Sequence, residues 1–198
     1  MGHSADIKEL YETIKEKASI GEIAGESIVT FSSQLLTTPR GRYDIDMFAT
    51  FLRLRGKTYD YKITYDQVVK LFLLPKPDDA HVLFVVGVDP PLRQGQTRYG
   101  FLVVQFTREE DMEVELNLDE YIPHNFDYLM SSDVYQAEYA SRLKQKYDAP
   151  AYDVVSSIFR GLTGRKIITP GAFSSHLNQA GVKCALKASE GILYPLEK

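Results

Sequence analysis

Hydrophobic and polar residues alternate over much of the chain between residues 27 and 118. Residues 42–48 and 51–55 show the period of two expected of strands that bury one face of a sheet. Pro39 and Gly41 are typical of a turn between such runs. Further extended runs cover residues 28–31, 58–63, 68–74, 82–88, 99–106 and 112–118. About eight short strands joined mostly by short turns predict an antiparallel barrel or sandwich.

Three stretches within this region or on either side of it have other patterns. Residues 89–96 contain two prolines and a glycine and are predicted to be a loop. Apolar residues in 5–19 recur at helical spacing, which predicts a short helix there. A second helix is predicted from about residue 132, because apolar residues stand at every fourth position, at Tyr135, Tyr139, Leu143 and Tyr147.

A last helix is predicted to begin at an Asp148 cap and to end at Gly164. Its apolar stripe consists of Tyr152, Val155, Phe159 and Leu162. Many short strands followed by one amphipathic helix predict a barrel with one open end closed by that helix.

The end of the chain returns to extended patterns. Residues 166–169 and 183–187 are predicted strands, with a loop at 170–171 between them. Residues 192–196 form another apolar run. A strand so near a terminus usually pairs with one that comes later, so we expect the natural protein to continue beyond residue 198.

Composition places the chain among ordinary globular proteins. Of the 198 residues, 44% are hydrophobic and 25% are charged, and the formal net charge is −4. That balance argues against a surface that is basic throughout, although a local basic patch is compatible with it. The single cysteine, Cys184, excludes an internal disulfide, and the longest apolar run is too short for a membrane span. Composition alone cannot choose between cytoplasm and nucleus.

Local charge is more informative than net charge. A basic region around the first hairpins has six cations against three carboxylates (Asp44, Asp46 and Asp60), and its cations are Arg40, Arg42, Arg53, Arg55, Lys57 and Lys62. Arg53 and Arg55 should share the face opposite Leu52 and Leu54. Arg93 and Arg98 bracket a segment that contains Gln94 and Gln96. The region is either a solvated sheet face or a docking surface, in which guanidinium and amide groups make directional hydrogen bonds.

Residues 109–120 form the opposite pole. This stretch contains seven carboxylates, and Arg108 next to it is the nearest cation. Such a run is usually a soluble strand edge, or it contacts a basic partner through electrostatic steering.

Signals of catalysis are weak. His3, His81, His124 and His176 have no metal-ligand spacing. Residues 161–166 lack the spacing of a phosphate-binding loop, and no nucleophile elbow is present. We therefore expect no enzyme activity, no metal site and no cofactor.

Several long motifs resemble one known family. They are 37–45 (TTPRGRYDI), 52–63 (LRLRGKTYDYKI), 73–76 (LLPK), 89–99 (DPPLRQGQTRY) and 187–196 (KASEGILYPL). They resemble the middle domain of the small subunit of the FACT complex, the structure-specific recognition protein family, in its fungal form. The resemblance runs from about residue 22 to residue 198.

The resemblance implies a fold of mixed but mainly β content. It implies a tandem pair of pleckstrin-homology-like modules, each an antiparallel barrel or sandwich closed by a C-terminal helix. Residues 25–164 would then be the first module, with a helical insertion at about 119–150. Residues 1–24 would be a helical leader whose first residues are a remnant of cloning. Residues 165–198 would be a linker and the truncated start of the second module.

The resemblance also implies a function. It indicates a non-enzymatic histone chaperone that reorganises nucleosomes during transcription, replication and repair, located in the nucleus on chromatin. The implied partners are core histones, replication protein A and, through a domain absent here, the large FACT subunit. Two further hypotheses remain: a phosphoinositide-binding module at a membrane, and direct DNA binding, which we expect to be weak and salt-sensitive.

In this family a threonine on the first hairpin and a glutamine in the Pro-Pro segment belong to a functionally sensitive surface. They correspond by motif to Thr38 and Gln94. Together with the charge pattern this gives a predicted partner-binding set of Thr38, Arg40, Arg42, Arg53, Arg55, Lys57, Arg93, Gln94, Gln96 and Arg98.

Overall fold

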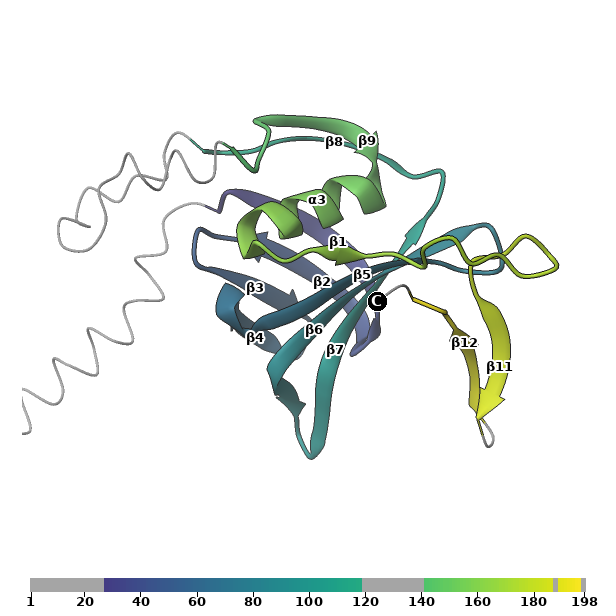
Figure 1. The fold of residues 1–198 in the computed structure, drawn as a ribbon. Helices are drawn as coiled ribbons and strands as arrows, with labels where there is room; N and C mark the ends of the chain where they lie inside the picture. Colours follow the sequence, from purple (N-terminus) through teal and green to yellow (C-terminus); the bar gives the residue numbers. More distant parts are fainter. Residues whose placement is uncertain (1–26, 119–140, 187–188, 197–198) are drawn as a thin grey trace, which may run out of the picture.

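The fold is seen in a computed structural model that describes residues 27–118, 141–186 and 189–196. Within these ranges the chain is mainly β with one α-helix, as predicted (Figure 1). The helix predicted at 5–19 and the first part of the one predicted from residue 132 lie outside the described residues.

One curved sheet of eight strands forms the body of the molecule. Its strands run in the order β10-β5-β6-β7-β1-β2-β3-β4, and every neighbouring pair is antiparallel except the parallel β10–β5 pair. A short 3-10 helix, η1 (Tyr65–Gln67), leads from β4 into β5. The strands are β1 (Val29–Thr38), β2 (Arg40–Met47), β3 (Phe51–Gly56), β4 (Asp60–Thr64), β5 (Val68–Pro75), β6 (His81–Gln94), β7 (Thr97–Thr107) and β10 (Ile167–Ile168).

Alternation along the strands builds the core. On β3, Leu52 and Leu54 are almost fully buried, whereas Arg53 and Arg55 are exposed. The same period on β2, β6 and β7 turns one side of each strand inward. The predicted antiparallel barrel-like sheet is therefore confirmed, and Arg53 and Arg55 lie on its outer face.

A helix closes one end of this sheet. Helix α3 (Ala151–Thr163) packs its apolar stripe inward, and the ring of Phe159 meets Phe84 edge to face at 5.1 Å between centroids. Gly164 ends the helix as predicted, with a left-handed φ of 66° and its N–H donating to the Arg160 carbonyl at 3.0 Å. The predicted cap was wrong, because Pro150 and not Asp148 is the N-cap.

Asp148 belongs instead to a separate ribbon. Strands β8 (Asp111–Glu115) and β9 (Lys146–Pro150) pair antiparallel and lie next to α3. The predicted helix over 132–147 is consequently wrong at its end, because Tyr147 pairs with Val114 inside this ribbon. The segment 89–96 is also not the predicted loop, since β6 continues to Gln94.

The final described residues form a hairpin. Strand β11 (Val182–Leu186) pairs with β12 (Ser189–Leu193), near the predicted extended segments. Hydrogen bonds tether this part to the body: Gln179 Nε2 donates to the Pro77 carbonyl at 2.7 Å, and Tyr194 Oη donates to the Pro75 carbonyl at 2.9 Å. Within the described ranges, no helix is long and apolar enough to cross a membrane.

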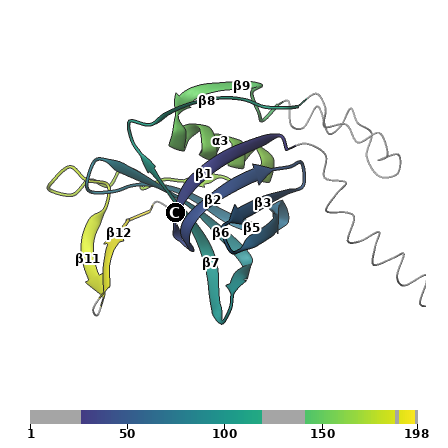
Figure 2. The same cartoon turned by 180° about the vertical axis from the view of Figure 1, so that it is seen from behind.

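The end of the sheet opposite α3 is formed by hairpin tips. The β6–β7 hairpin projects furthest from the body there, and the view from behind shows the same arrangement (Figure 2). The β1–β2 and β3–β4 turns carry other members of the predicted partner-binding set.

Candidate partner-binding surface

The arginines of β3 lie on the outer face of the sheet and are held by carboxylates. Arg53 Nε donates to both carboxylate oxygens of Asp60 at 2.9 Å, from the neighbouring strand β4. Arg55 makes a second forked contact, Nε to Asp46 Oδ2 at 2.6 Å and Nη2 to Asp46 Oδ1 at 3.1 Å. Paired forks of this kind fix both side chains. The two arginines therefore shape the surface, and much of their donor capacity is already used.

Asp46 is the most buried member of this network, with an exposed residue fraction of 6%. Burial disfavours its charge, but hydrogen bonds from Arg55 and Thr30 and the nearby positive charges outweigh this, so the pKa of Asp46 is lowered. The Thr30 hydroxyl donates to Asp46 Oδ1 at 2.9 Å. The carboxylate is thus ionised at neutral pH and links β1, β2 and β3.

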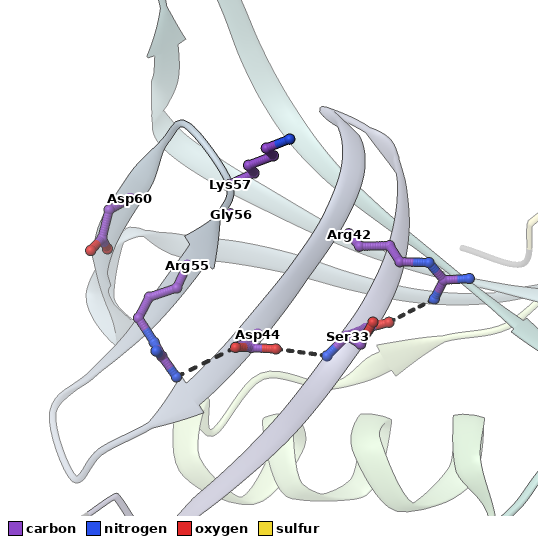
Figure 3. Close-up of a pocket in the computed structure, with 7 residues that line it drawn as sticks. All are labelled: Ser33, Arg42, Asp44, Arg55, Gly56, Lys57 and Asp60. Atoms are coloured by element: carbon purple, nitrogen blue, oxygen red, sulfur yellow. Dashed lines mark hydrogen bonds and ion pairs between the residues drawn. The ribbon is translucent and has the colours of Figure 1, made fainter.

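A shallow polar hollow of about 390 Å³ lies beside the network (Figure 3). At its edge a bulge in β1 gives Ser33 a φ of 54°. The Ser33 N–H donates to Asp44 Oδ1 at 2.7 Å, and the Ser33 carbonyl accepts from Arg42 Nη1 at 2.9 Å. The lining residues are Ser33, Arg42, Asp44, Arg55, Gly56, Lys57 and Asp60. Charges of both signs meet in the hollow, so it favours polar groups over apolar ones.

Four cations of the predicted set have no such partner. Arg40, Lys57, Arg93 and Arg98 are exposed, and none makes an ion pair or a side-chain hydrogen bond with another described residue. They lie at the β1–β2, β3–β4 and β6–β7 hairpins. Because their charges are uncompensated locally, these four are the strongest candidates for contacts with an anionic group.

The polar members of the set are separated from one another. Thr38 ends β1 and lies opposite Val103 of β7, whereas Gln94 lies opposite Thr97 at the tip of the β6–β7 hairpin. Their partners on β7, Val103 and Thr97, are six residues of extended chain apart, which places Thr38 and Gln94 about 20 Å from each other along β7. Gln96 is exposed in the turn. The ten predicted residues therefore divide into a paired group on β2–β3 and a free group at the hairpin tips.

A group of tyrosines near the hairpin tips was not anticipated from the sequence. Tyr59 and Tyr61 of the β3–β4 hairpin stack with ring centroids 6.1 Å apart. Burial, followed by the nearby phenols of Tyr99 and Tyr59, raises the pKa of Tyr43. The Tyr61 hydroxyl is buried and finds no hydrogen-bond partner among the described residues. The sequence signal for this group was the alternation of apolar residues at 59, 61 and 63, which places Tyr59 and Tyr61 on the same face of the strand.

A histidine and a carboxylate form a close pair near the start of β6. His81 Nδ1 and Asp78 Oδ2 are 2.9 Å apart, and the pKa of Asp78 is lowered: burial opposes its charge, but hydrogen bonds from His81, Ala80 and Lys76 favour it more strongly. In the part of the chain that is described, no cluster of His, Cys, Asp and Glu could hold a metal ion.

Comparison with known proteins agrees with this arrangement. The sequence model of the SSRP1 PH domain family matches residues 26–167. The chain is 59% identical to FACT complex subunit pob3 of Schizosaccharomyces pombe over 188 residues, and 56% identical to FACT complex subunit POB3 of Candida albicans over 191 residues. These alignments cover 95% and 96% of the chain but only 34% and 33% of the two relatives, so the chain spans about a third of their length. The chain belongs to the SSRP1 PH domain family, and the fold expected from the resemblance is confirmed.

Proposed function

We propose that this chain is a non-enzymatic docking module of the FACT complex in the nucleus. It binds histones or replication-associated proteins such as replication protein A while nucleosomes are reorganised in transcription and replication. The observation that supports this most directly is the identity to FACT complex subunits over nearly the whole chain. The large FACT subunit would associate through another part of the protein.

The mechanism is scaffolding. Paired side chains on β2, β3 and β4 hold the outer face, and the hairpin tips present free cations beside it. A rigid surface of this kind loses little conformational entropy when a partner binds. Binding shields or competes for partner surfaces, and no substrate is turned over.

The free and the paired groups have different roles in this proposal. Arg40, Lys57, Arg93 and Arg98 contact the partner, with Thr38, Gln94 and Gln96 as hydrogen-bonding groups. Arg42, Arg53 and Arg55 hold the outer face in place. Arg42 donates one hydrogen bond to the Ser33 carbonyl, and the two arginines of β3 make forked contacts with Asp60 and Asp46. Reversing the charge of a paired arginine would therefore disturb the fold as well as the surface.

A pull-down with immobilised chain, core histones and replication protein A tests the proposal. The informative variants are Gln94→Lys and Arg40→Glu/Lys57→Glu, which replace exposed or hairpin-tip groups. Lys144→Glu/Lys166→Glu is the matched control for charge, because both lysines are exposed and neither belongs to the β1–β2, β3–β4 or β6–β7 hairpin. We expect the two informative variants to lose several-fold in retention of at least one partner. Wild-type retention of both partners by both variants would remove this surface from consideration.

Arg53→Glu/Arg55→Glu belongs in the same experiment as a test of the paired group. Its retention is compared only after thermal unfolding has been measured, since it breaks the Asp60 and Asp46 contacts. A loss of binding at unchanged stability would move these arginines into the contact group.

A further inference from the structure

The end of the β6–β7 hairpin extends beyond the rest of the sheet. The register pairs β5 with β6 as far as Val88, and it pairs β1 with β7 only at Val103 and Val104. Residues 92–94 and 97–99 pair only with each other in the described sheet. The projecting ribbon is visible in both views of the fold (Figures 1 and 2). Both of its outer edges consequently present backbone N–H and C=O groups without a strand beside them.

Two like charges stand directly opposite each other on this ribbon. Arg93 and Arg98 are register partners, and both are exposed. Neither makes an ion pair or side-chain hydrogen bond in the described part of the chain. Like charges at directly opposed positions destabilise a strand pair. An anion between the two guanidinium groups would turn this repulsion into attraction.

The two faces of the ribbon differ. Leu92 packs against the core, and its register partner Tyr99 is half-buried, so their face is turned toward the barrel. Arg93 and Arg98 lie one position along and therefore face away from it. Gln94, opposite Thr97, is half-buried on the barrel side. The outward face thus carries two adjacent cations, Arg93 and Arg98, next to two open strand edges.

We propose that the outward face of the β6–β7 hairpin binds an extended acidic segment of a partner protein. The segment adds as a strand along an open edge, and its side chains on the outward face bring carboxylates to the guanidinium groups of Arg93 and Arg98. Main-chain pairing supplies affinity, and the arginine forks select for carboxylates. This inference rests on the proposed docking function and names the chemistry of the partner at this part of the surface.

An acidic protein segment fits these groups better than a nucleic acid does. Tight binding of duplex DNA uses about 6–10 phosphate contacts, whereas this face of the ribbon presents two arginines. A nucleic acid also has no peptide groups to pair with an open strand edge. A segment that pairs its backbone and presents alternate carboxylates to one face uses both features of the ribbon.

Fluorescence anisotropy tests the proposal with the full chain. The probe is a fluorescein-labelled peptide of about ten alternating Glu and Thr residues, long enough to follow the ribbon. We expect Arg93→Glu/Arg98→Glu to weaken its binding by about tenfold or more, and Arg93→Gln/Arg98→Gln to weaken it less. The control Lys144→Glu/Lys166→Glu carries the same charge change as the glutamate variant and should bind nearly as well as wild type. A probe with N-methylated alternate amides should also bind less tightly, because it cannot complete the strand pairing.

The fold of each variant is checked by thermal unfolding. Arg93→Gln/Arg98→Gln removes a like-charge pair and should not melt below wild type, whereas Arg93→Glu/Arg98→Glu exchanges one like-charge pair for another and should melt close to wild type. Wild-type affinity in Arg93→Glu/Arg98→Glu, an equal loss in the lysine control, or stronger competition by single-stranded DNA than by unlabelled peptide would overturn the inference. Absence of peptide binding by wild type would overturn it as well, and would leave the pull-down as the separate test of docking.

Discussion

At the scale of single residues, Asp46 shows how one side chain organises the outer face. The alternation of β2 predicts an outward, solvated carboxylate, yet Asp46 is buried between flanking strands. Its oxygens accept hydrogen bonds from Thr30 on β1 and Arg55 on β3. A charge in this position is stabilising only while its partners remain. The residue is therefore a structural link beneath the candidate surface.

Replacing this carboxylate should cost stability in a pH-dependent way. We expect Asp46→Asn to lower the free energy of unfolding by roughly 1–3 kcal/mol at neutral pH. The folded-state pKa of Asp46 lies below its unfolded value, so the contribution is present above the unfolded pKa and is lost as pH falls through the folded pKa. The difference between wild type and variant should consequently shrink in acid. Urea unfolding at neutral and acidic pH measures it, with the exposed Glu109→Gln as control. A difference that does not change with pH would contradict this account.

At the scale of elements, the strands were largely predictable and their partners were not. Alternation located the core strands and the outward direction of Arg53 and Arg55. It could not show that Arg55 meets Asp46, because cross-strand register depends on the folded sheet. Alternation also could not show that Arg93 and Arg98 make no ion pair with another described residue, although both were predicted as candidates.

The errors have identifiable causes. Pro90 and Pro91 indicated a loop, but β6 accommodates them because the ladder to β7 skips from Gly87 to Leu92 there. At these positions a proline removes no ladder hydrogen bond. The tyrosines at every fourth position suggested a helix through Tyr147, but that residue pairs with Val114 in the β8–β9 ribbon. In the second case tertiary pairing overrode a local signal.

At Gly161 of helix α3, packing and helix propensity have opposite effects on the stability of an alanine variant. An alanine Cβ at Gly161 would lie 2.3 Å from Leu143 Cδ2 and 3.2 Å from the Arg142 carbonyl oxygen. Glycine to alanine in a helix interior normally gains about 1 kcal/mol, whereas overpacking a core costs about 1–3 kcal/mol. Since Leu143 is buried, we expect Gly161→Ala to be destabilising by about 1 kcal/mol.

Chemical unfolding of Gly161→Ala in two backgrounds, wild type and Leu143→Ala, separates these effects. In a Leu143→Ala background the clash is removed, so Gly161→Ala should become stabilising there. Gly100→Ala is a control with open space around the new Cβ. Stabilisation by Gly161→Ala in the wild-type background would show that Leu143 does not pack firmly on the helix.

At the scale of the whole molecule, the net charge of −4 includes two separate regions of opposite charge. Free cations gather at the hairpin tips, while the β8–β9 ribbon lies on the side of α3, away from the β6–β7 tip (Figures 1 and 2). Asp111, Glu113 and Glu115 alternate along β8 and are exposed. Lys146 Nζ lies 2.5 Å from Glu113 Oε1, and that hydrogen bond lowers the pKa of Glu113. The ribbon therefore complements a basic partner, and the hairpin tips complement an acidic one.

If histones approach through the acidic ribbon, their association rate should depend on its charge. We expect Asp111→Lys/Glu115→Lys to slow association with fluorescently labelled core histones by about tenfold at low salt, with a smaller change in dissociation, because long-range attraction acts on the encounter. Stopped-flow mixing at about 50 and about 200 mM salt measures both effects. Asp66→Lys/Glu190→Lys makes the same charge change at exposed residues outside the ribbon and should slow association far less. Equal slowing in both variants would assign the effect to net charge, whereas an unchanged rate in Asp111→Lys/Glu115→Lys would exclude the ribbon from histone encounter.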